Sequence, residues 1–124
     1  MVKALLDSVI LIDHLNGIRQ ATEWLASEEW SLLAISAITR AEVLNGASQE
    51  ESLHIASLLD SFHCLPLDAR TADRAAHYRR EFRLRLPDAF QAAVAESNQL
   101  EFVTRNTRDF GSNMFDFVVV PYQL

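Results

Sequence analysis

The sequence predicts a single α/β domain spanning residues 1–124, with a mostly parallel central sheet and helices on both of its faces. The chain has 124 residues, which is enough for one core and too few for two domains. Hydrophobic residues make up 49% of it, as in an ordinary globular protein. Short apolar runs alternate with longer segments of helical periodicity, and this alternation is typical of βαβ units, whose strands lie parallel.

The first expected strand is the apolar run 2–6. Residues 8–16 follow with helical spacing, and Gly17 stands where a helix would end. Apolar residues at helical spacing mark a second short helix over 18–25. The second expected strand is the apolar run 31–35.

The middle of the chain continues the alternation. A helix is expected over 39–47, ending near Gly46. Residues 50–62 carry apolar side chains at helical spacing and predict another helix. A brief extended segment, 64–67, is the third expected strand.

The last part predicts two helices and two strands. Residues 69–84 place alanines and a phenylalanine on one side and predict an amphipathic helix. Pro87 opens a helix over 88–98, because proline is favoured in the first helical turn. Residues 101–104 and 117–120 are the last two expected strands.

The composition argues against several classes of protein. No apolar run approaches the roughly 20 residues needed to cross a bilayer, and the N-terminus reaches Asp7 too early for a signal peptide. Cys64 is the only cysteine, so neither a disulfide framework nor a cysteine metal site is expected. We therefore expect a cytoplasmic protein that does not associate with a membrane.

The net charge of −6 argues against non-specific binding of nucleic acid over the whole surface. Six positive charges nevertheless fall in two clusters: Arg79, Arg80, Arg83, Arg85, Arg105 and Arg108. The planar guanidinium group matches phosphate oxygens, so these clusters can form a local anion-binding face. A solvated helix face with salt bridges is the simpler interpretation, and both stay open.

Acidic and amide side chains follow the expected strands. Asp7 comes directly after the first strand, and Asn106 and Asp109 follow the fourth. Glu42 lies in the first turn of the helix after the second strand and can project over the same edge. Open parallel sheets bind ligands at the carboxyl ends of their strands, where the strand order reverses. Asp88 opens the helix that leads to the fourth strand, so its place near this edge depends on the tertiary fold.

Each acid also has a purely structural interpretation. Asp7 can cap the following helix, and Glu42 can form a capping box with Thr39. Asp88 suits the positive end of a helix dipole, and Asp109 suits a turn. Carboxylates that converged in one cleft would instead raise one another's pKa values unless a cation neutralised them. Oxygen ligands favour Mg²⁺ or Mn²⁺ over zinc, and the four histidines show no paired metal-ligand spacing.

Four segments resemble, in order and spacing, the motifs of PIN domains, and in particular those of VapC toxins from bacterial toxin–antitoxin pairs. They are LLDSVILID at 5–13, SAITRAEVLNG at 36–46, LPDAFQAA at 86–93 and VTRNTRDF at 103–110. Each motif is weak by itself, but four in order are specific.

This resemblance implies a three-layer α/β/α fold, a metal-dependent endoribonuclease activity, a homodimer and a cognate antitoxin protein as partner. It identifies Asp7, Glu42 and Asp88 with the acidic triad of the family. Asn106 stands where many members carry a fourth acid, and Asp109 follows one helical turn later.

Two further positions depart from the family pattern. Ser8 replaces the commoner threonine but keeps a hydroxyl that could hold Asp7 in place. Gln91 stands where an aliphatic residue is usual, and the sequence gives no functional interpretation of it.

The working hypothesis is that Asp7 and Asp88 bind Mg²⁺, or Mn²⁺, while Glu42 and Asn106 complete its coordination. The expected catalytic residues are Asp7, Glu42, Asp88 and Asp109. A metal-bound water of lowered pKa then attacks the RNA phosphodiester in line, leaving a 3′-hydroxyl and a 5′-phosphate as the resemblance implies. Four arginines are expected to hold the RNA backbone: Arg79, Arg83, Arg105 and Arg108.

The main alternative is a non-catalytic PIN-like module that binds a partner and has an impaired metal site, which Asn106 supports. A receiver-like phosphoacceptor would need a lysine late in the sheet, but Lys3 is the only lysine. The three glycines lie too far apart for a nucleotide-binding loop. Trp24, Trp30 and the helix 50–62 could contact a second copy or an antitoxin, although core packing is the simpler interpretation.

Overall fold

The computed structural model describes residues 1–111 and 114–124. In this part of the chain five strands form one sheet, in the order β3-β2-β1-β4-β5, and every neighbouring pair is parallel. The strands are β1 (Ala4–Leu6), β2 (Leu33–Ser36), β3 (His63–Leu65), β4 (Glu101–Val103) and β5 (Val118–Val119). The helices are α1 (Ser8–Leu15), α2 (Arg19–Ala26), α3 (Ala37–Asn45), α4 (Ser52–Leu59), α5 (Ala69–Phe82) and α6 (Leu86–Ser97), and a 3₁₀ turn, Trp30–Leu32, precedes β2.

The chain begins at the centre of the sheet and reverses its direction of growth beside β1. It moves outward from β1 to β2 and β3, then crosses back and places β4 on the other side of β1. The register pairs Leu6 of β1 with Val103 of β4. The residues that follow them, Asp7 and Thr104, therefore leave the sheet side by side. This switch point is where open α/β sheets bind ligands.

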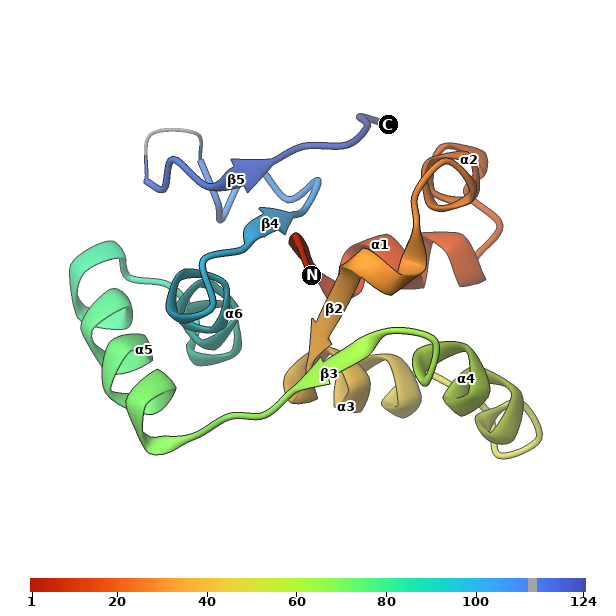
Figure 1. Ribbon diagram of the computed structural model, residues 1–124, viewed down its shortest axis with the longest axis horizontal. Helices are drawn as coiled ribbons and strands as arrows, with labels where there is room; N and C mark the ends of the chain where they lie inside the picture. The colour runs from red at the N-terminus through yellow and green to blue at the C-terminus, as the bar shows by residue number, and fades with distance from the viewer. Residues whose placement is uncertain (112–113) are drawn as a thin grey trace.

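Two layers of helices cover the two faces of the sheet, which confirms the predicted α/β/α arrangement (Figure 1). Helices α5 and α6 pack on one face, over a core that includes Leu5 and Phe102. Helices α1 to α4 pack on the other face, over a core that includes Leu6 and Val103. Successive strand residues point to opposite faces, which is why Leu5 and Leu6 belong to different cores. Because both faces are covered, the central strands β1 and β2 are buried along their whole length.

The start of α3 differs from the prediction. Ser36 caps this helix, since its Oγ accepts a hydrogen bond from the Thr39 N–H at 3.2 Å. The helix therefore begins before Thr39, and Glu42 lies in its second turn rather than its first. The predicted capping box of Thr39 and Glu42 is wrong, because Thr39 is already inside the helix.

Trp30 is partly buried and packs against the core, as the simpler interpretation predicted. Its ring stacks on Phe62 with 4.9 Å between centroids, and its Nε1 donates to the Leu25 carbonyl at 2.8 Å. Across residues 1–111 and 114–124, none of the helices has both the length and the apolar character needed to span a bilayer.

Candidate active site

Asp7 lies at the carboxyl edge of the sheet, directly after β1. Its backbone N–H donates to the Val103 carbonyl of β4 at 2.9 Å, and Thr104 Oγ1 donates to its Oδ2 at 2.7 Å. Only 6% of the residue is exposed. The Asp7 side chain does not cap α1, so the simple structural interpretation of this acid fails. The hydroxyl that holds it comes from Thr104 rather than from Ser8.

The Asp7 carboxyl is surrounded by groups that oppose its ionisation. Burial is the largest cause, and it raises the pKa of Asp7 to about 6. The hydrogen bond from the Thr104 hydroxyl lowers this pKa, and the nearby backbone N–H of Ser8 lowers it further. The negative charges of Asp88 and Glu42 raise it. Two acids that are distant from Asp7 in the chain therefore lie close enough to repel its charge, and one of them is Asp88, which the sequence alone could not place.

Asp88 lies in the first turn of α6, is nearly buried, and pairs with Arg85. Arg85 Nε is 3.2 Å from Asp88 Oδ2. Burial raises the pKa of Asp88, the neighbouring Arg85 lowers it, and the charge of Asp109 raises it again. The Asp88 charge is also the largest cause of a raised Arg85 pKa, to which Asp109 and Glu42 add. Arg85 is therefore a cation that acts on Asp88, Asp109 and Glu42.

Asn106 and Asp109 form a turn that follows β4. Asn106 Nδ2 donates to Asp109 Oδ2 at 2.9 Å, and Asn106 Oδ1 accepts from the Asp109 N–H at 3.3 Å. The Asn106 N–H donates to Thr104 Oγ1 at 3.0 Å, which links this turn to the residue that holds Asp7. The turn interpretation of Asp109 is confirmed, yet its charge still reaches Asp88.

The donor set at this edge suits a hard divalent cation. The carboxylate oxygens of Asp7, Glu42 and Asp88 are the ligands that Mg²⁺ and Mn²⁺ prefer. A divalent charge would also relieve the repulsion that raises the Asp7 pKa. Within residues 1–111 and 114–124, no three His, Cys, Asp or Glu side chains already stand at metal-ligand spacing. Asp88 is turned to Arg85 and Glu42 is exposed, so rotation of these two side chains would be needed to complete a site on Asp7.

Two of the four arginines expected to bind RNA are engaged within the protein. Arg105 forms a two-point ion pair with Asp13, in which Nη2 lies 2.9 Å from Oδ1, and Tyr122 donates its hydroxyl to the same carboxylate at 2.9 Å. Arg79 Nη1 donates to the Leu84 carbonyl at 2.7 Å and so holds the connection between α5 and α6. Both side chains therefore support the local structure.

The other two arginines, Arg83 and Arg108, are exposed. Arg108 lines a cavity of about 320 Å³ together with Arg85 and Asp109. Two guanidinium groups thus adjoin one of the acids, which is an arrangement suited to a phosphate that approaches the acidic edge.

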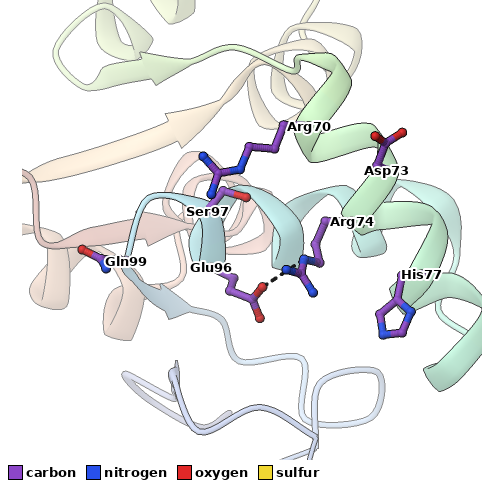
Figure 2. Close-up of a pocket in the computed structure, with 7 residues that line it drawn as sticks. All are labelled: Arg70, Asp73, Arg74, His77, Glu96, Ser97 and Gln99. Carbon is purple, nitrogen blue, oxygen red and sulfur yellow. Dashed lines mark ion pairs between the residues drawn. The ribbon is translucent and has the colours of Figure 1, made fainter.

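A second cavity, of about 390 Å³, lies between α5 and the C-terminal end of α6 (Figure 2). Arg74 Nε of α5 pairs there with Glu96 Oε1 of α6 at 3.1 Å. The residues that line the cavity mix both charges: Arg70, Asp73, Arg74, His77, Glu96, Ser97 and Gln99. Glu96 follows Asp88 by two turns of α6, about 12 Å along the helix axis. This cavity is therefore separate from the acidic edge.

Sequence reasoning missed three polar residues that shape the acidic edge. Thr104 could have been found, because it follows β4 directly and so lies beside Asp7. Arg85 was considered only as one member of an arginine cluster. Its pairing with Asp88 depends on how the chain turns into α6. Gln91 had no interpretation, although it proves to be buried and hydrogen-bonded.

Comparison with known proteins agrees with this architecture. The family model described as PIN domain matches residues 4–112. Ribonuclease VapC10 of Mycobacterium tuberculosis is 35% identical in an alignment 124 positions long, which covers 95% of this chain and 92% of that protein. A toxin–antitoxin complex from Klebsiella pneumoniae superposes with a TM-score of 0.90 at 36% identity, covering 98% of this chain and 100% of that chain. DNA-bound VapBC from Salmonella typhimurium superposes with a TM-score of 0.74 at 26% identity, covering 89% of this chain and 91% of that chain.

The acids of the carboxyl edge fall within the matched residues, and the alignment to the Mycobacterium tuberculosis protein runs through nearly the whole chain. Together with the parallel five-stranded sheet, these matches decide the classification. The chain belongs to the PIN-domain family and, within it, to the VapC group.

Proposed function

We propose that the protein is a Mg²⁺-dependent endoribonuclease and the toxin of a toxin–antitoxin pair. The observation that carries the proposal is the gathering of acids around the buried Asp7 at the carboxyl edge of the sheet, where the charges of Asp88 and Glu42 help to raise its pKa. Acids that a fold gathers in spite of their repulsion indicate a functional site that a cation completes. The relatives support the activity and the partner, since one is named a ribonuclease and another is described as a toxin–antitoxin complex.

Asp7, Asp88 and Glu42 would hold the ion, and Asn106 would complete its coordination. When bound there, Mg²⁺ would lower the pKa of a water, so that this water could lose a proton and attack an RNA phosphodiester. The ion would also offset the charge that develops on the phosphate. Thr104 fixes the Asp7 carboxylate at the end of β1. The buried position of Asp7 limits the number of waters that compete for its oxygens.

Positive side chains beside the acids would hold the RNA backbone. Arg108 and Arg85 line one cavity with Asp109, and Arg83 is exposed just before Arg85. Contacts of this kind position a nucleic acid without reading its sequence. Asp109 would act beside the metal ligands, through its charge on Asp88 and its hydrogen bonds to Asn106.

Cleavage of RNA by the purified protein tests this proposal. EDTA should abolish cleavage, and Mg²⁺ or Mn²⁺ should restore it. Asp7→Asn and Asp88→Asn should each lower the rate by orders of magnitude while the circular dichroism spectrum stays unchanged. Asp73→Asn, which changes an exposed acid of α5, is the matched control and should cleave as the wild type does. Equal rates for wild type and Asp7→Asn in Mg²⁺ would refute the proposal.

Two observations favour the alternative, a non-catalytic module that binds a partner. Arg85 already pairs with Asp88, and Asn106 replaces an acid that many relatives carry. In such a module the guanidinium group would stand in for the metal. The module should neither cleave RNA in Mg²⁺ or Mn²⁺ nor bind Mn²⁺ in calorimetry, whereas the nuclease should do both.

The antitoxin has a suitable surface beside the acids. A groove of about 350 Å³ runs between α1, α3 and α4, and its lining is apolar with two glutamates: Ile12, Leu15, Asn16, Glu42, Val43, Gly46, Ala47, Glu51 and Ile55. This lining suits an amphipathic helix with basic residues. Because Glu42 belongs to both groove and acidic edge, an occupant would cover the site.

Two experiments test the proposed assembly. Leu15→Glu should weaken binding of the cognate antitoxin in calorimetry while RNA cleavage continues, since Leu15 lines the groove and is not one of the proposed metal ligands. Unchanged antitoxin affinity would contradict this location. We also propose a homodimer, and light scattering of the purified chain at the mass of a monomer would contradict it.

A further inference from the structure

We propose that Gln91 is a positioning residue, which holds α3 and α6 at the spacing that lets Glu42 and Asp88 share one cation. This inference rests on the proposed function. Gln91 lies in the middle of α6 and is only 1% exposed, although its amide group is polar. Its side chain reaches across to α3 rather than filling the core between α6 and the sheet.

Gln91 is the centre of a continuous chain of hydrogen bonds. Ser36 Oγ donates to Gln91 Oε1 at 2.7 Å, and Gln91 Nε2 donates to Thr39 Oγ1 at 2.6 Å. Thr39 Oγ1 in turn donates to the Leu6 carbonyl at 3.5 Å. Each group donates to the next, so the chain has one direction. In the described part of the protein every buried side-chain nitrogen and oxygen has a hydrogen-bond partner, so this network is complete.

The network joins the elements that carry the three acids. Leu6 precedes Asp7 at the end of β1. Gln91 lies three residues after Asp88 on α6, so the two share one face of that helix. Thr39 lies three residues before Glu42 on α3, so these two residues also share one face of their helix. The bond between Gln91 and Thr39 therefore ties the two acid-bearing helix faces together one turn away from the acids.

Packing alone gives no reason for an amide at this position. An aliphatic side chain of similar volume would fill the space without removing an amide from water, and a satisfied buried hydrogen bond adds little net stability. What the bonds add is a defined direction and a fixed separation of the helices, because a slide of α6 against α3 would break them. A fixed separation matters where two helices supply ligands to one ion.

Binding of Mn²⁺, measured by calorimetry without RNA, tests the proposal. Gln91→Met keeps the length of the side chain and removes both hydrogen bonds. We expect its Kd for Mn²⁺ to rise about 10–100-fold, as when groups that orient metal ligands are removed. The Mg²⁺ concentration for half-maximal cleavage should rise in parallel, with a smaller change at saturating Mg²⁺. Thr39→Val should reproduce the weakening, and Thr39→Ser, which keeps the hydroxyl, should bind as the wild type does.

Val94→Ala controls for a loss of stability, because Val94 is fully buried on the same helix and takes no part in the network. If this variant weakens Mn²⁺ binding as much as Gln91→Met at a comparable melting temperature, the effect is structural and the proposal fails. Unchanged Mn²⁺ binding by Gln91→Met also overturns it. Should Gln91→Met not fold, equal Mn²⁺ binding by Thr39→Val and Thr39→Ser is the result that refutes it.

Asp7→Asn separates this inference from the proposed function. If Asp7→Asn binds Mn²⁺ as well as the wild type, the metal site is wrong and both proposals fall. If Asp7→Asn loses binding while Gln91→Met keeps it, the metal site stands and only the positioning role is refuted.

Discussion

Asp7→Asn should make the protein more stable at neutral pH, although the same variant should cleave RNA more slowly by orders of magnitude. The pKa of Asp7 is about 6 in the folded protein, against an ordinary value of 3.8. Because the folded value is the higher one, the protonated Asp7 carboxyl stabilises the folded protein. This contribution to the free energy of unfolding is fully present below pH 3.8 and is lost as the pH rises through 6. This difference corresponds to about 3 kcal/mol of unfolding free energy at pH 7.5. Asparagine carries no charge and can still accept the hydrogen bond from Thr104.

Urea denaturation in EDTA measures this effect. The free energy of unfolding of Asp7→Asn should exceed that of the wild type by up to about 3 kcal/mol at pH 7.5 and by about 1 kcal/mol at pH 4.5. Mg²⁺ at 100 times its Kd should stabilise the wild type by about 2.7 kcal/mol and so reduce the difference in unfolding free energy between the two proteins. Asp73→Asn, the exposed control, should change little. The reasoning would be refuted if Asp7→Asn were no more stable than the wild type at pH 7.5, or if the difference in unfolding free energy between them did not depend on pH.

Three further substitutions test the charges around the edge. Arg85→Ala should tighten Mn²⁺ binding severalfold in calorimetry, because the guanidinium no longer competes for Asp88; an unchanged Kd would contradict this. Arg105→Ala should lower the free energy of unfolding by about 2 kcal/mol at pH 7, because it leaves Asp13 buried without its cation. Arg105 is the largest cause of the lowered Asp13 pKa, so this loss should shrink as the pH falls below 3.8. Arg108→Ala should weaken RNA binding and reduce the salt dependence of log affinity by about 0.7 for each phosphate that the side chain neutralises, without changing the melting temperature.

The sequence could predict the sheet and its edge because both follow from local pattern. Strands covered on both faces are mostly apolar runs, so all five expected strands correspond to observed ones, and the end residues of the strands lie within two positions of the predicted ones. Parallel pairing then places those end residues together, which is why Asp7 and Asn106 could be assigned to one edge. The register that pairs Leu6 with Val103 requires only that the two strands end at the same level of the sheet.

The placement of α6 could not be predicted, because it depends on how the helix packs across the sheet. Asp88 and Gln91 reach the edge through that packing. The start of α3 was ambiguous for a related reason, since Ser36 and Thr39 are both good caps that precede the same apolar residues. The structure uses Ser36, because the hydroxyl of Thr39 is bonded to Gln91, which lies 52 positions away in the sequence.

The ion pair between Arg85 and Asp88 raises the question of whether the acidic edge is a closed salt bridge or a metal site. A closed salt bridge should satisfy the most buried acid of the acidic edge, which is Asp7. Arg85 reaches Asp88 Oδ2 from an exposed position, and Arg85 is not among the groups that lower the pKa of Asp7, which stays at about 6. The guanidinium therefore neutralises the outer acid and leaves the inner one charged at a cost to stability. A small divalent ion can contact the Asp7 oxygens where a planar guanidinium does not reach, so the unrelieved charge of Asp7 favours a metal site.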